Sequence, residues 1–119
     1  MNLEFLITES FDNDIKILPE AQQNRIKDEI NHVSGSLLNG RSFFMEKASL
    51  PYIFNLKGGL DSSLYVVKVD EDKKMVVAVD EDPVFDKVSL TMYRLVDEND
   101  ADQIYKEVGE QLYKSIGVL

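Results

Sequence analysis

Three apolar, β-branched runs follow one another between residues 64 and 96, and they constrain the fold of this chain more than any other feature. Leu64–Val69 and Met75–Val79 are each closed by a cluster of three acidic residues, and Val88–Val96 forms the third run. Short runs of this composition, separated by turn-forming residues, are typical of consecutive β-strands. The sequence therefore predicts three successive strands in its second half.

The first part of the chain predicts a strand followed by a helical hairpin. Apolar and polar side chains alternate loosely over Leu3–Thr8, which favours an opening strand. Ser10 or Asp12 can cap the short helix that follows, because both side chains accept hydrogen bonds from free N–H groups. Pro19 should end this helix and begin a second one, since proline is tolerated only in the first turn.

The remaining segments complete an α+β pattern. The apolar stripe of the second helix ends near Gly35, and residues 34–51 predict a short helical extension followed by a loop. Tyr52–Leu56 is a further strand candidate, and Ala101–Ile116 predicts an amphipathic C-terminal helix that Gly117 ends. The order is strand, helical hairpin, about four further strands and a C-terminal helix. It predicts an α+β fold with a mostly antiparallel sheet and helices on one face.

Length and composition fit one globular domain over residues 1–119, with 44% hydrophobic residues. The chain has no cysteine, which excludes disulfides, a thiolate nucleophile and thiolate metal sites. Its apolar runs are too short to span a bilayer, and its N-terminus lacks the pattern of a signal peptide. We therefore expect a cytoplasmic protein that does not enter a membrane.

The formal net charge of −9 is concentrated in the second half, where residues 61–119 carry seven basic and fourteen acidic side chains. Such a surface repels polyanions at long range and speaks against general nucleic-acid binding, although it leaves room for a local basic groove. The acidic clusters lack the pattern of a calcium loop, so no metal site is expected. In a meander, Asp70–Asp72 could approach the cluster that begins at Asp97.

Three basic residues lie within or at the edge of the strands: Lys68, Lys74 and Arg94. A cation in an apolar strand needs water, a partner or a ligand, which makes these residues the leading functional candidates. The alternative for the two lysines is that their stems cover apolar surface at the strand ends. A four-residue turn would place the lysines on opposite faces. A three- or five-residue turn would place both on one face, as a shared phosphate site demands.

Arg94 has a second interpretation. In a regular strand it shares one face with Leu90 and Met92, which is otherwise apolar. A salt bridge to Asp97, Glu98 or an acidic turn residue would then explain its position.

Lys57, Tyr65 and Tyr93 are the candidate substrate-binding residues. The two tyrosines could stack on bases, as aromatic side chains do on single-stranded RNA, or they could be half-buried strand residues. Lys57 precedes Gly58 and Gly59, whose N–H groups could surround an anion or could simply form a turn.

Two blocks of the sequence resemble the RelE/ParE family of small toxins from bacterial toxin–antitoxin operons. The first spans residues 5–26 and includes the Leu18-Pro19 break between the expected helices. The second is the strand–turn–strand segment of residues 64–80, in which Lys68 and Lys74 stand where the family usually has basic residues.

The resemblance implies a toxin that an antitoxin protein neutralises. Ribonuclease members of the family cleave mRNA at the ribosome without a metal or cofactor, and other members act on DNA gyrase. At the matching positions, Lys68 and Lys74 would contact phosphate. Arg94 would stabilise the charge that develops in the transition state.

The sequence departs from the family in its charge. Members are commonly basic, whereas this chain is acidic and ends in an acidic amphipathic segment in place of a short basic tail with a tyrosine. Tyr105 lies on the apolar stripe of that segment, which favours core packing. The sequence thus favours a toxin-type protein whose endoribonuclease activity is weakened or lost. The alternative is a non-catalytic protein-interaction module on the same fold.

Overall fold

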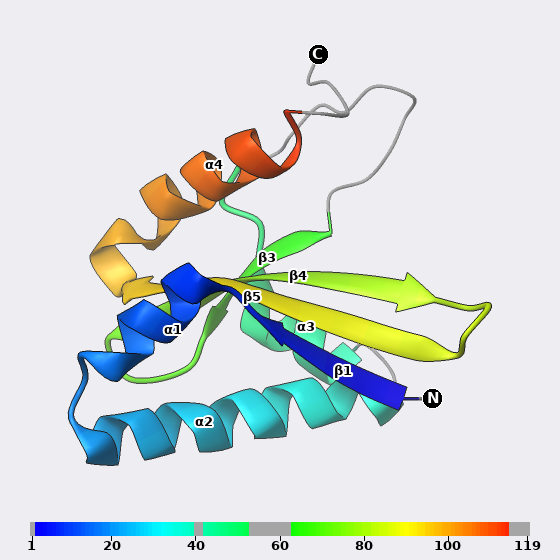
Figure 1. The fold of residues 1–119 in the computed structure, drawn as a ribbon, viewed down its shortest axis with the longest axis horizontal. Coiled ribbons are helices and arrows are strands. Elements are labelled where there is room, and N and C mark those ends of the chain that lie inside the picture. Colours follow the sequence, from blue (N-terminus) through cyan, green and yellow to red (C-terminus); the bar gives the residue numbers. More distant parts are fainter. Residues whose placement is uncertain (1, 40–41, 53–62, 115–119) are drawn as a thin grey trace.

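The computed structural model describes residues 2–39, 42–52 and 63–114, which form one mixed sheet with helices on both of its faces (Figure 1). The sheet has five strands in the order β1-β5-β4-β3-β2. Their bounds are Asn2–Ile7 (β1), Ala48–Ser49 (β2), Leu64–Lys68 (β3), Lys73–Asp82 (β4) and Lys87–Asp97 (β5). β1 runs parallel to β5, and every other neighbouring pair is antiparallel. The predicted α+β class and mostly antiparallel sheet are confirmed.

The helices follow the predicted order. They are Glu9–Lys16 (α1), Glu20–Gly35 (α2), Ser42–Lys47 (α3) and Ala101–Leu112 (α4), with 3₁₀ turns at Ser36–Asn39 (η1) and Glu98–Asp100 (η3). The helical hairpin is confirmed, with Pro19 as the N-cap of α2. The last helix ends at Leu112, with Tyr113 as its C-cap, so the predicted end at Gly117 was wrong. No helix in the described part of the chain is both long and apolar enough to cross a membrane.

Thr8 caps α1, and the predictions of Ser10 or Asp12 were wrong. The Thr8 hydroxyl oxygen accepts a hydrogen bond from the N–H of Phe11 at 3.2 Å. It also lies 3.0 Å from the carbonyl oxygens of Met92 and Tyr93, to which it can donate. Because β1 ends at Ile7, this contact fixes the start of α1 against β5 directly beyond the last strand pair.

β2 pairs with β3 on the side away from β4, and the predicted strand Tyr52–Leu56 lies mostly outside the described residues. Tyr52 lies outside any strand, and residues 53–62 lie outside the described residues, as does the turn expected around Gly58. β2 is only two residues long, with Ala48 opposite Val67 and Ser49 opposite Val66.

Helices cover both faces of the sheet, which corrects the prediction that they lie on one face. α2 lies below the sheet in Figure 1 and α4 lies above it. The reason is visible in β3, where Leu64 and Val66 pack toward α4 while Tyr65 and Val67 pack into the core with α1 and α2. A strand that is apolar on both faces needs cover on both, and the uninterrupted apolar runs of the sequence already carried this signal.

Candidate functional site

Lys68 and Lys74 lie directly opposite each other on β3 and β4, on one face of the sheet. The connection is a three-residue turn over Asp70–Asp72, closed by a hydrogen bond of 3.1 Å from the N–H of Val69 to the carbonyl of Lys73. Of the turn lengths left open by the sequence, this is one that places both lysines together. They share the face that η3 and α4 cover, since Val66 and Val76 of the same face pack against α4.

One carboxylate serves both lysines. The Glu98 Oε1 atom lies 3.8 Å from the Lys68 Nζ atom and 3.9 Å from the Lys74 Nζ atom. Both distances are longer than a direct hydrogen bond, so the contact is ionic and loose. A hydrogen bond of 2.9 Å from the Glu98 N–H to the Asp72 carbonyl fixes the backbone of η3 beside the turn.

A β-bulge in β5 determines where Arg94 points. Arg94 is opposite Val76, but the next paired residues are Met92 and Val77, which leaves Tyr93 as an extra residue in β5. The bulge interrupts the alternation of side chains between the two faces of the sheet. Arg94 therefore lies on the face of Val76, toward α4, and the expectation that it shares a face with Met92 was wrong.

Arg94 is held by Asp14 of α1, not by the acidic residues named from the sequence. Its Nε and Nη2 atoms donate to the two carboxylate oxygens at 2.7 and 3.2 Å, and the Leu95 N–H donates to the same carboxylate at 2.9 Å. The hydrogen bond to Asp14 raises the pKa of the Arg94 guanidinium further, against the opposing effect of burial. This bidentate pair attaches α1 to the part of β5 that β1 does not cover.

The three predicted cations therefore lie on neighbouring strands and on one face, each beside an internal carboxylate. The two acidic clusters expected to approach each other do so, since the Glu98 N–H donates to the Asp72 carbonyl. Lysines pair with the second cluster: Lys73 binds Asp97 and Lys74 faces Glu98. Within residues 2–39, 42–52 and 63–114, no group of three His, Cys, Asp or Glu side chains could hold a metal ion.

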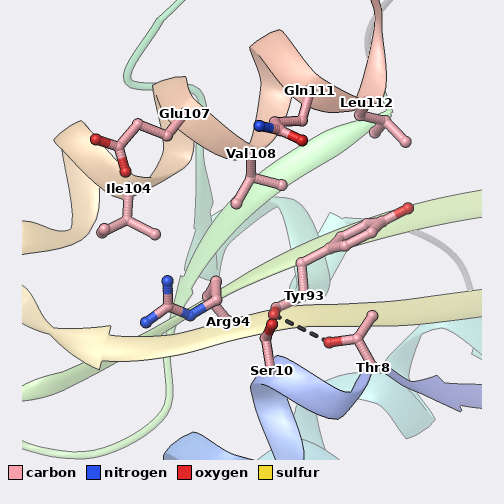
Figure 2. A pocket seen from close by; sticks show the side chains of 9 residues that line it. All are labelled: Thr8, Ser10, Tyr93, Arg94, Ile104, Glu107, Val108, Gln111 and Leu112. Carbon is pink, nitrogen blue, oxygen red and sulfur yellow. Dashed lines mark hydrogen bonds between the residues drawn. The ribbon is translucent and has the colours of Figure 1, made fainter.

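An open groove of about 550 Å³ lies beside Arg94, between the start of α1, β5 and α4 (Figure 2). Arg94 and Tyr93 point from β5 into this groove, and five residues of α4 form its opposite wall. Burial raises the pKa of the Tyr93 phenol, and the nearby Asp80 and Tyr113 act in the same direction. Tyr93 is therefore a neutral hydrogen-bond donor at physiological pH.

The other two candidate substrate-binding residues are not placed with this site. Tyr65 is buried on the opposite face, where its ring meets Phe44 edge to face with centroids 5.7 Å apart. This position explains Tyr65 by core packing and leaves no open ring for a base. Lys57 lies outside the described residues.

The fold of this chain is similar to that of a solved structure. The protein superposes on a chain of the toxin–antitoxin complex RelBE2 from Mycobacterium tuberculosis with a TM-score of 0.50 and 11% sequence identity. The match covers 82% of this chain and 100% of that chain. The fold is RelE/ParE-like.

No family model and no curated protein matches the sequence. The YoeB/ParE toxin from Agrobacterium tumefaciens superposes with a TM-score of 0.45 and 16% identity, over 80% of this chain and 98% of that chain. This second superposition is too loose to support an argument.

On this RelE/ParE-like fold, Asp14 and Glu98 are the site residues that the sequence did not assign. Asp14 lies next to Ile15 at the edge of the buried stripe of α1, a position where an acidic side chain needs a partner. Glu98 could not be singled out from the sequence, because it belongs to a run of acidic residues. Only the fold shows which of them lies beside Lys68 and Lys74. Lys68 and Lys74 bring two ammonium groups to one face of the sheet, whereas Tyr93 lines the groove beside Arg94.

Proposed function

We propose that this protein is the toxin-type component of a bacterial toxin–antitoxin module, acts in the cytoplasm and is neutralised by an antitoxin protein. The observation that carries the proposal is the RelE/ParE-like fold with Lys68 and Lys74 side by side on one face. Lysine ammonium groups form strong, charge-assisted hydrogen bonds to phosphate oxygens, and this pair offers two of them on neighbouring strands.

The reaction that fits this pair is metal-independent cleavage of mRNA at the ribosome. The 2′-hydroxyl oxygen of a nucleotide attacks the adjacent phosphorus and loses its proton to water. The bond to the 5′-oxygen breaks, which leaves a 2′,3′-cyclic phosphate, and the 5′-oxygen takes up a proton as it leaves. Lys68 and Lys74 would stabilise the charge that develops on the non-bridging oxygens. Water supplies the proton to the leaving oxygen, since the raised pKa of the Tyr93 phenol makes it a weak general acid.

Controlled expression in a bacterial host tests this function. The parent chain is expected to slow growth only weakly, in keeping with the weakened activity that its acidic surface predicts, and the double variant Lys68→Ala/Lys74→Ala should relieve this arrest. Lys87→Ala is the matched control, since Lys87 also pairs with a glutamate, at 3.4 Å, but on β5 beside β1. Equal arrest by parent and double variant, at equal protein level and melting temperature, would remove the lysine pair from the mechanism. Co-expression of a small protein encoded next to this chain should restore growth if that protein is the antitoxin.

A non-catalytic protein-interaction module on the same fold is the second candidate. The specific observation in its favour is that Lys68, Lys74 and Arg94 are each paired with a carboxylate of the chain itself. This candidate predicts no growth arrest by the parent chain, together with tight binding to a neighbouring gene product.

A further inference from the structure

The Lys68–Lys74 pair poses an electrostatic problem that the fold solves with one side chain. Residues directly opposite each other in an antiparallel pair have Cβ atoms about 4.5–5.5 Å apart, and like charges at such positions are destabilising. The two ammonium groups here converge on a single oxygen atom of Glu98. Glu98 thus places one carboxylate charge between two ammonium groups.

Glu98 is held less tightly than Asp14, and a ligand could therefore displace Glu98 more easily. Asp14 receives three hydrogen bonds of 2.7–3.2 Å, and its side chain is 18% exposed. Glu98 makes two ionic contacts of 3.8 and 3.9 Å, and its side chain is 45% exposed. Rotation of an exposed side chain is enough to remove Glu98 from the lysines, whereas removal of Asp14 would break three hydrogen bonds between α1 and β5.

We propose that Glu98 occupies a phosphate-binding position between Lys68 and Lys74 and is displaced when a phosphate group binds there. The inference rests on the proposed function, which needs a phosphate at this pair, and adds the residue that regulates access to it. Each ammonium group has three hydrogen-bond donors. A phosphate has several charged oxygens and can satisfy both groups at hydrogen-bond distance, which one carboxylate oxygen at 3.8 and 3.9 Å does not.

Binding measurements on the full chain test this inference with Glu98→Gln. The probes are inorganic pyrophosphate and a short unstructured RNA with 2′-O-methyl groups, which cannot be cleaved. NMR shifts of the lysine ε-methylene groups report binding at the pair. We expect the variant to bind both probes roughly tenfold more tightly than the parent, because an attached competitor is gone. A gain for pyrophosphate alone would support the site and assign it to a small phosphate compound.

Glu4→Gln is the matched control. Its side chain is also 45% exposed and pairs with a lysine, but it lies on β1, so it removes the same charge away from the pair. Adding Lys68→Met/Lys74→Met to Glu98→Gln should abolish the gain. Equal gains in Glu98→Gln and Glu4→Gln, or no gain in either, would overturn the inference.

This experiment separates the inference from the proposed function. Tighter phosphate binding by Glu98→Gln without growth arrest by any variant would leave the site standing and reject the toxin function. Growth arrest that depends on the lysine pair, combined with unchanged phosphate binding in Glu98→Gln, would support the toxin function and reject the role proposed for Glu98.

Discussion

At Asp14 a single carboxylate accepts two hydrogen bonds from Arg94 and one from the N–H of Leu95. Asp14→Ala leaves a partly buried guanidinium and a backbone N–H without this acceptor. Hydrogen bonds to a charged group contribute about 1.5–3 kcal/mol, so we expect the free energy of unfolding to fall by about 2–3 kcal/mol. Urea denaturation monitored by circular dichroism measures this change.

Asp12 offers a matched control on the same helix. It pairs with Lys16 four residues later, with a side chain that is 46% exposed. Exposed pairs of this kind contribute about 0.3–0.5 kcal/mol, so Asp12→Ala should have little effect. Similar losses for Asp12→Ala and Asp14→Ala would mean that the Asp14 clamp contributes no more than an ordinary surface pair.

At the scale of elements, Thr8 joins the start of α1 to β5. Thr8→Ala removes both the N-cap and the hydroxyl group beside the Met92 and Tyr93 carbonyls. Loss of an N-cap typically costs about 1 kcal/mol, and we expect a total loss of about 1–2 kcal/mol from the free energy of unfolding. Thr8→Ser keeps the hydroxyl and should retain most of the stability in the same urea experiment. If serine were as destabilising as alanine, the methyl group and not the hydroxyl would be responsible.

The elements themselves could largely be predicted from the sequence. The three apolar runs became β3, β4 and β5, and the break at Pro19 separates α1 from α2, because hydrophobic periodicity and proline geometry act locally. The cap at Thr8 was missed, since three nearby polar residues could all cap a helix. The two-residue β2 is too short to produce a periodic signal.

The candidate site was predictable in part. The sequence identified Lys68 and Lys74 as candidates. One of the turn lengths considered, three residues, is the length observed, and it pairs the two lysines. It could not identify their partner or that of Arg94, because Asp14 and Arg94 are 80 residues apart and only the folded sheet brings them together. The bulge at Tyr93 was equally invisible, since no glycine marks it and all residues of β5 fit a regular strand.

At the scale of the whole molecule, the net charge of −9 limits how RNA can bind. A protein that binds single-stranded nucleic acid releases counterions, so its affinity falls as salt is added. In a plot of the logarithm of affinity against the logarithm of salt concentration, each phosphate contact contributes a slope of about −0.7. Two lysines therefore predict a slope of about −1.4 for the Glu98→Gln variant. Repulsion from the acidic surface makes it shallower still.

Fluorescence anisotropy with a labelled RNA measures this slope over a salt series. A slope steeper than about −2 would require more phosphate contacts than the lysine pair provides, and would point to a basic surface elsewhere on the chain.

The extra residue in β5 also affects how this chain can be compared with others. Suppose that β5 is aligned with a strand of another protein that has no bulge. If Met92 is aligned correctly, a one-residue gap is needed at Tyr93 before Arg94 can also be aligned correctly. Without that gap, every position from Arg94 to Asp97 is matched to a side chain on the wrong face. Residue roles carried over from a relative to the end of β5 are therefore reliable only when the alignment follows the hydrogen-bond register.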